Sequence, residues 1–435
     1  MNRSIARVVI AALLAAGVGR TQLAAAASVY EVRYLPGLGG NNSRGNSLND
    51  DGLVSGYSNI AGNHYRHATM WLGDSPTDLG VLGSKNSQKN SNVAWPVKNT
   101  LGLIVGISQT DAPDPYGESW SCSAFFVPAT STGSRCLGFA WQNGKMHPLP
   151  TLGGTHGFAA AANNSGQIVG WAENTVRDSS CTPPQIFQFH AVVWGPHGDA
   201  IDDLPLLPLT SSSAATAIND KGQIVGISGA CDQAIGAGTA AHSVIWNGGN
   251  VTEIPNLGGA QWNTPTAINH RGDVAGFGDL PGDVITEAFL WTPEGGLSPL
   301  GFLYPDHSLS EAFGINESRQ VVGLSCNDAE CRAFLWQDGV MYDLNVLAGI
   351  PADELLTHGM DIDDAGVITG RATRIATGER VTYVATPTGA AFAPRAAKRG
   401  GAPSAAAKVF LPADVLKEAL HPLGPGLERL QGAAR

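Results

Sequence analysis

Hydrophobic and polar positions alternate along this chain in short runs, and the same order of runs returns about every 50 residues. One example is Ala217 to Gly226 (AINDKGQIVG), followed about 20 residues later by His242 to Trp246 (HSVIW). Short alternating runs rich in β-branched and aromatic residues are typical of half-buried strands. Each repeat contains four of them, as in AATAI, QIVGIS, HSVIW and NVTEIPNLG. The pattern therefore predicts four strands per repeat.

The repeats align on one turn residue between their first and second strands. The seven turn residues are Asn49, Asn99, Asn163, Asn219, Asn269, Asn316 and Asp363. Three positions later stands a glycine, or Arg319 in the sixth repeat, and four positions beyond that every repeat has a second glycine. Asn and Asp bond to their own backbone and glycine accepts positive φ, so this segment predicts a tight hairpin. Such four-stranded units at a period of roughly 40 to 50 residues are typical of β-propeller blades.

We therefore predict an all-β fold, a seven-bladed β-propeller of four-stranded antiparallel blades. Small side chains before the turn residue place the first strand of each repeat next to the axis. The seventh repeat lacks a fourth strand, whereas Ser28 to Gly40 (SVYEVRYLPGLGG) reads as a fourth strand without a repeat. We expect this N-terminal strand to complete the last blade, because ring closure protects the open edges of a sheet.

Both ends of the chain differ from the repeats. Residues 1–27 have Arg3 and Arg7, a short apolar run and small residues near Ala27, which predicts a cleaved signal peptide. Residues 28–389 form the predicted propeller. Residues 390–435 are rich in Ala, Gly and Pro with seven Lys or Arg against three Asp or Glu. We expect this tail to be mostly disordered, with a short helix near 411–420.

Charge and hydropathy limit the partners. The net charge of −11 argues against nucleic acid, since phosphate binding needs clustered Lys and Arg. The mature chain has no apolar run long enough to span a membrane. We expect an exported monomer, extracellular or periplasmic, that needs no cofactor or metal.

Cysteine placement agrees with export. All six cysteines lie between the second and third strands of their repeats, and an even number in an oxidising compartment predicts disulfides. The predicted pairs are Cys122–Cys136, Cys181–Cys231 and Cys326–Cys331. The alternative is a metal site at CNDAEC, but zinc would need two further soft ligands nearby.

The repeat resembles the HAF family of bacterial extracellular repeats over about residues 34–388. The resemblance rests on the AINDKGQIVG type of core, on EAFLW at Glu287 to Trp291, on RAFLW at Arg332 to Trp336, and on the LGG that follows the fourth strand. The literal His-Ala-Phe is absent, and HAT, HAV and HSV begin at His67, His190 and His242. The resemblance implies an exported, propeller-like protein of undefined activity, and it carries no catalytic residues.

Topology places a candidate site on the face that carries the long loops between second and third strands, because binding residues concentrate on loops held by a rigid scaffold. The position five before the turn residue should point into the axial channel there, and it is most polar in the first, sixth and seventh repeats. The candidate binding residues are Arg44, Trp262, Asp306, His307, Glu311, Glu354 and His358. The simpler interpretation, which we favour, is that they are ordinary rim residues that satisfy loop backbone groups.

Three functions follow from these observations. The first is a scaffold that binds a glycan or a protein. The second is a polysaccharide hydrolase or lyase that uses Glu311, His358 and either Asp306 or Glu354 as acid and base; hydrolysis would need two carboxylates roughly 5 to 10 Å apart. The third is an extracellular structural protein.

Overall fold

The computed structural model describes residues 28–389, except 85–87, 119–121, 123–124, 127–129, 131–132, 197, 199 and 233–235, together with Leu411. The expected signal peptide (1–27) lies outside the described residues, and so does the expected tail (390–435) with its helix, apart from Leu411. The described chain is all-β, as predicted, with short helical pieces such as α2 (Leu344–Ala348) and the 3-10 turn η2 (Thr239–Ala241).

Strands of each repeat pair antiparallel in a unit of four, and we call these units blades and name them by their first strand. Three units are separate four-stranded sheets, and the other four are joined two by two into eight-stranded sheets through a single parallel residue pair. The blades are β2 (Gly39–Leu48), β3 (Leu53–Ile60), β4 (Arg66–Leu72), β5 (Ser75–Asp78); β6 (Ser91–Asn92), β7 (Ile104–Pro113), β8 (Ser134–Gln142), β9 (Lys145–Pro148); β10 (Gly157–Ala162), β11 (Ile168–Arg177), β12 (Phe187–Trp194), β13 (Ile201–Asp203); and β14 (Ser212–Ile218), β15 (Ile224–Gly229), β16 (His242–Asn247), β17 (Asn250–Ile254). They continue with β18 (Thr264–Ile268), β19 (Val274–Asp279), β20 (Thr286–Thr292), β21 (Gly296–Gly301); β22 (Leu309–Ile315), β23 (Val321–Cys326), β24 (Cys331–Gln337), β25 (Val340–Asp343); and β26 (Glu354–Ile362), β27 (Ile368–Arg374), β28 (Glu379–Pro387), β1 (Tyr30–Leu35).

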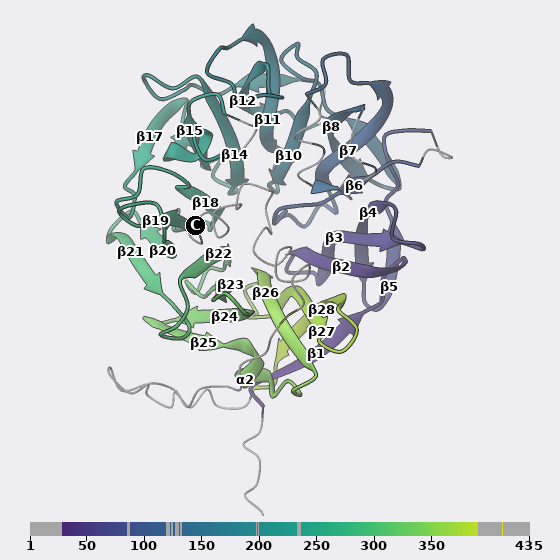
Figure 1. Ribbon diagram of the computed structural model, residues 1–435, viewed down its shortest axis with the longest axis vertical. Coiled ribbons are helices and arrows are strands. Elements are labelled where there is room, and N and C mark those ends of the chain that lie inside the picture. Colours follow the sequence, from purple (N-terminus) through teal and green to yellow (C-terminus); the bar gives the residue numbers. More distant parts are fainter. Residues whose placement is uncertain are drawn as a thin grey trace, which may run out of the picture.

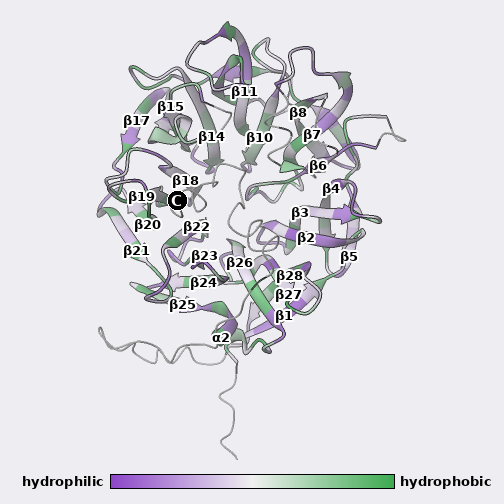
Figure 2. Cartoon of the chain, in the orientation of Figure 1, coloured by the Kyte–Doolittle hydropathy of each residue, from purple (hydrophilic) through white to green (hydrophobic). Residues whose placement is uncertain are grey.

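The blades stand around a common centre, as in a β-propeller, and strands such as β2, β10, β14, β22 and β26 lie nearest to it (Figure 1). Hydrophobic and hydrophilic stretches are interspersed around the ring and are not gathered in one sector (Figure 2). The apolar core accordingly consists of several clusters between neighbouring blades.

The N-terminal strand pairs with the last repeat. β1 runs antiparallel to β28 over six residue pairs, from Tyr30 opposite Pro387 to Leu35 opposite Thr382. The Tyr30 hydroxyl also donates to the carbonyl oxygen of Gly366, 3.1 Å away. The N-terminal strand therefore pairs with β28, in an eight-stranded sheet that also contains β26, β27 and β2 to β5.

The second glycine of each repeat has a steric cause. A Cβ at Gly226 would lie 2.1 Å from the carbonyl oxygen of Ala214, and a Cβ at Gly370 would lie 1.9 Å from that of His358. Both oxygens belong to the neighbouring inner strand, at the position five before the turn residue. The register of the β14 blade is irregular directly after this position, between Ala215 and Ala217. Any other residue would push the first two strands apart.

Tryptophans that end the third strands hold the blades together. Trp71, Trp194 and Trp246 are buried, and each indole N–H donates to a proline carbonyl oxygen of the preceding repeat segment. A buried indole needs such an acceptor, so the contact fixes the position of the ring as well as burying apolar surface.

Candidate functional site

The disulfides lie where the sequence predicted them. The structure contains Cys122–Cys136, Cys181–Cys231 and Cys326–Cys331, and the predicted pairing is confirmed. Cys181–Cys231 joins the β10 blade to the β14 blade, whereas the other two bonds close loops within one blade. The sulfur atoms of Cys326 and Cys331, the two cysteines of CNDAEC, are bonded to each other, so they offer no thiolates to zinc.

The three candidate residues at the position five before the turn residue are all buried. Arg44, Glu311 and His358 have exposed fractions of 3%, 1% and 0%. The Nε of Arg44 donates to Oδ1 of Asn46 at 2.6 Å, and its guanidinium lies 5.3 Å from the centre of the Tyr57 ring. These contacts hold the arginine against its own blade.

His358 has its two ring nitrogens in different contacts. Nδ1 lies 2.8 Å from Oγ1 of Thr357, and Nε2 lies 3.2 Å from Nη2 of Arg371. A guanidinium only donates, so Nε2 of His358 must accept and the ring proton is on Nδ1. The lone pair that a general base would use is therefore engaged by Arg371.

The other four candidate residues secure connections between blades. Asp306 accepts from Nδ2 of Asn327 at 3.1 Å, and Nδ1 of His307 contacts Oγ of Ser325 at 2.8 Å. Glu354, the first residue of β26, accepts a hydrogen bond from the hydroxyl of Tyr34. These contacts agree with the interpretation that such residues satisfy neighbouring groups.

Trp262 precedes β18 with a positive φ of 54° and is partly buried. It packs against an apolar cluster that includes Phe125, Phe158 and Phe189. Phe125 and Phe158 stack with ring centres 5.0 Å apart, and Phe158 holds the position five before its turn residue. The position five before the turn residue is therefore apolar in the third repeat and polar in the first, sixth and seventh, as the sequence indicates.

The opposite end of the axis carries the turn residues. Oδ1 of Asn219 accepts from the backbone N–H groups of Lys221 and Gln223, and its Nδ2 donates to the carbonyl oxygen of Asn269 at 2.9 Å. The same link to the next turn residue is made by Asn49, Asn163, Asn269 and Asn316. Each of these asparagines thus caps its own hairpin and ties it to the next blade.

A second set of contacts joins the residues that directly follow the turn residues. These residues are Asp50, Thr100, Asn164, Asp220, His270, Glu317 and Asp364. Most side chains in the set accept the backbone N–H of the corresponding residue in the preceding repeat, with N to O distances of 2.7 to 3.3 Å. The last of these bonds, from Asp364 N to Oδ1 of Asp50, joins the seventh repeat to the first. We call this set the turn-face ring.

The turn-face ring surrounds a hollow of about 70 Å³ at the mouth of the axis. Its lining includes every member of the ring, together with Lys98. The Nζ of Lys98 lies 2.9 Å from Oδ1 of the buried Asp361 and also donates to the carbonyl oxygen of Ile362. The positive charge of Lys98 is therefore paired with Asp361. The negative charge of the hollow comes from the carboxylates of Asp50, Asp220, Glu317 and Asp364.

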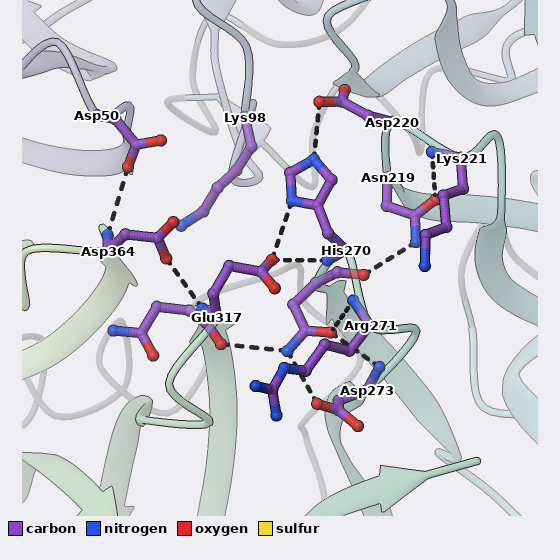
Figure 3. Close-up of polar contacts among 12 residues, drawn as sticks. Asp50, Lys98, Asn219, Asp220, Lys221, His270, Arg271, Asp273, Glu317 and Asp364 are labelled. Carbon is purple, nitrogen blue, oxygen red and sulfur yellow. Dashed lines mark hydrogen bonds and ion pairs between the residues drawn. The ribbon is translucent and has the colours of Figure 1, made fainter.

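His270 bridges two of these carboxylates (Figure 3). Its Nε2 lies 2.7 Å from Oδ2 of Asp220, and its Nδ1 lies 2.9 Å from Oε1 of Glu317. The hydrogen bond to Asp220 raises the pKa of His270, partial burial opposes this, and Glu317 raises it further. Partial burial would raise the pKa of Asp220, but hydrogen bonds from His270 and Asn164 bring it below its usual value.

A separate group of buried acids lies between the β6 and β10 blades. Oε1 of Glu118 accepts from the backbone N–H groups of Ile186 and Phe187, at 2.9 and 3.0 Å. Burial, and after it the neighbouring Glu173, raise the pKa of Glu118 to about 7. Glu173 accepts from the backbone N–H of His156 at 2.8 Å. The β7–β8 connection is thus fixed to the next blade through a carboxylate.

Sequence reasoning placed the candidate site on the long-loop face and did not find the hollow on the turn face. A signal was present, because the turn residue is Asn or Asp in every repeat whereas the residue after it is acidic, basic or neutral. That difference separates a position that shapes the hairpin from one that faces the axis.

The chain matches no protein-family profile, and no curated protein matches its sequence. Among solved structures it is similar to the β-propeller domain of the Trilobed protease from Pyrococcus furiosus, with 13% identity, 72% of this chain and 84% of that chain covered, and a TM-score of 0.41. It is also similar to puromycin hydrolase (12%, 70% and 45%, TM-score 0.44) and to Trypanosoma rangeli sialidase (11%, 73% and 56%, TM-score 0.37). The chain spans less than half of the hydrolase and just over half of the sialidase. These similarities are too distant to indicate an activity or a substrate.

Among the described residues, no helix is long and apolar enough to cross a membrane.

Proposed function

We propose that the chain is an exported, HAF-type, seven-bladed β-propeller whose N-terminal strand completes the last blade. The pairing of β1 with β28 supports the closing strand. The bond from Asp364 N to Oδ1 of Asp50 supports contact between the first and last blades. Three disulfides are compatible with export, because such bonds persist in oxidising compartments.

We propose further that the protein is a binding scaffold and that the turn-face hollow is its ligand site. The observation that carries this is a hollow at the mouth of the axis to which every repeat contributes a polar residue. Four carboxylates face one lysine and one histidine there, so the hollow favours a compact cationic group, such as the amine or guanidinium of a peptide ligand. Electrostatic complementarity of this kind chiefly gives specificity and a fast association rate.

The hydrolase alternative has less support from the geometry. Glu311 and His358 are buried, so a polysaccharide chain would reach them only after the surrounding residues moved. The Nε2 of His358 already faces Arg371. The structural-protein alternative predicts no specific ligand at all, and a binding experiment separates it from the scaffold.

The test uses a protein that begins at Ser28 and calorimetric titration with tri-lysine and tri-arginine peptides. We expect saturable binding that weakens as salt is raised, and at least tenfold weaker binding in Glu317→Gln with Asp364→Asn. Both replacements keep one oxygen that can accept the neighbouring N–H and remove the negative charge. Asp203→Asn with Glu253→Gln is the matched control, because these acids also contact histidines but lie in β13 and β17 at the outer edges of blades.

Binding that is absent, or equal in the two double variants, would refute a cationic ligand at the turn face. Polysaccharide turnover by the unaltered protein that Glu311→Gln abolishes would instead establish the hydrolase.

A further inference from the structure

One residue of the C-terminal segment lies against the propeller on its long-loop face. The backbone N–H of Leu411 donates to the carbonyl oxygen of Ala329 at 3.1 Å. The residue is 7% exposed and packs against Leu355, with the partly buried Ile375 next to them. Leu411 thus contacts Ala329, Leu355 and Ile375, and we call these three residues its pocket.

Three segments of the last two blades build this pocket. Ala329 lies in the short turn that Cys326–Cys331 closes, Leu355 is the second residue of β26, and Ile375 directly follows β27. The backbone N–H of Ile375 donates to the carbonyl oxygen of Asp353 at 2.9 Å, which fixes one side of the pocket. The disulfide closes the turn that contains Ala329, so covalent and hydrogen bonds of the fold hold both of these segments.

Charge at the edges of the pocket suits the segment that enters it. Asp328 precedes Ala329 and Asp353 lies beside Ile375, and both carboxylates are on exposed residues. Residues 390–435 carry seven Lys or Arg against three Asp or Glu, and Lys408 comes three positions before Leu411. The segment therefore combines an apolar residue, Leu411, with nearby basic charge in the sequence. This suits apolar side chains flanked by the carboxylates of Asp328 and Asp353.

We propose that the pocket formed by Ala329, Leu355 and Ile375 is a docking site for the chain's own C-terminal segment, with Leu411 as its anchor. On this proposal Leu411 is the point at which the segment meets the long-loop face, at the β22 and β26 blades. A partner that binds this part of the face has to compete with it. The proposal concerns the opposite face from the turn-face hollow and does not depend on a ligand there.

The first experiment uses a protein of residues 28–389 and a synthetic peptide of residues 404–420. We expect saturable binding by calorimetry, at least tenfold weaker for the peptide with Leu411→Asp. We also expect binding several-fold weaker for the protein with Asp328→Asn and Asp353→Asn. Asp338→Asn, in the turn between β24 and β25, is the control for loss of one surface charge and should bind as the unaltered protein does.

A second measurement uses the chain from Ser28 to Arg435, so that the segment remains attached. Trypsin should cut after Lys408 more slowly than after Arg399, which lies further from the anchor in sequence, and Leu411→Asp should remove the difference. Absence of peptide binding, or equal binding of the two peptides, would overturn the proposal. So would cleavage after Lys408 at a rate that Leu411→Asp leaves unchanged.

Discussion

The side-chain amide of Asn219 donates to the main-chain oxygen of Asn269, 2.9 Å away, although the two residues are fifty positions apart in the chain. Both hold the same place in successive repeats, and both are buried. The asparagine that gives the sequence its period is thus also the residue that joins one blade to the next.

Replacing this asparagine should show its two roles separately. Asn219→Ala removes the cap of its own turn and leaves the Asn269 oxygen without this donor, so we expect a loss of about 2 to 3 kcal/mol in the free energy of unfolding. Asn219→Ser keeps part of the cap through its hydroxyl but cannot reach the next blade, and should lose about 1 to 2 kcal/mol. Denaturant unfolding of the three proteins measures both values. Equal losses in the two variants would mean that the link between blades contributes nothing.

Glu118 should make stability depend on pH near neutrality. Its pKa in the folded protein is raised to about 7, from 4.5. The folded state therefore holds the proton more tightly than the unfolded state, and stability falls as pH rises from about 4.5 through 7. Glu118→Gln keeps the oxygen that accepts from Ile186 and Phe187 and removes the charge. We expect it to stabilise the protein by on the order of 2 kcal/mol at pH 8 and by much less at pH 5.

The measurement for Glu118 is urea unfolding at both pH values. The reverse order, with the larger gain at pH 5, would contradict the assignment of a raised pKa. Glu253→Gln is the control for loss of a carboxylate, because Glu253 is half exposed and contacts a single histidine.

His270 should change stability with pH in the same direction as Glu118, although here the protonated form carries the stabilising charge. Its pKa is raised from 6.5 through its hydrogen bonds to Asp220 and Glu317. The contribution of the protonated ring is fully present below about pH 6.5 and is lost as pH rises through the higher pKa of the folded state. His270→Gln should therefore lower the melting temperature more at pH 5.5 than at pH 8.5. His242→Gln, which removes a histidine with one carboxylate partner, is the control.

The disulfides should rank by the length of chain that they enclose. Cys181–Cys231 spans 50 positions and Cys326–Cys331 spans 5. In the chain-entropy account, removing the first by serine replacement costs about 4 kcal/mol and removing the second about 2 kcal/mol. Unfolding of the two double-serine variants tests the order. A larger loss from the short bond would show that packing in the native state outweighs the entropy of the unfolded chain.

Much of the local structure could be read from single repeats. The run HSVIW predicted a strand, and β16 covers His242 to Asn247. The segment SVYEVRYL predicted a strand near the N-terminus, and β1 covers Tyr30 to Leu35. Such runs are predictable because the alternation of side chains and the conformational needs of Asn and Gly act within a few residues.

The candidate site was less predictable, because burial of a polar residue depends on neighbouring blades. Glu311 and His358 are charged or polar residues at a position expected to face a channel, yet both are buried. Asp220 and Glu317 were not singled out, since nothing near them in sequence shows that His270 lies between them.

The sequence by itself determined the repeat, its four strands, the hairpin chemistry of Asn and Gly, and the pairing of six cysteines, because these follow from local conformation and from spacing. Only the tertiary structure decided which polar residues meet. His270 contacts Asp220, which precedes it by 50 positions, and Glu317, which follows it by 47, and the backbone N–H of Asp364 donates to Asp50, 314 positions earlier in the chain. Contacts between blades depend on how each repeat is placed beside its neighbours, and no segment of one repeat contains that information.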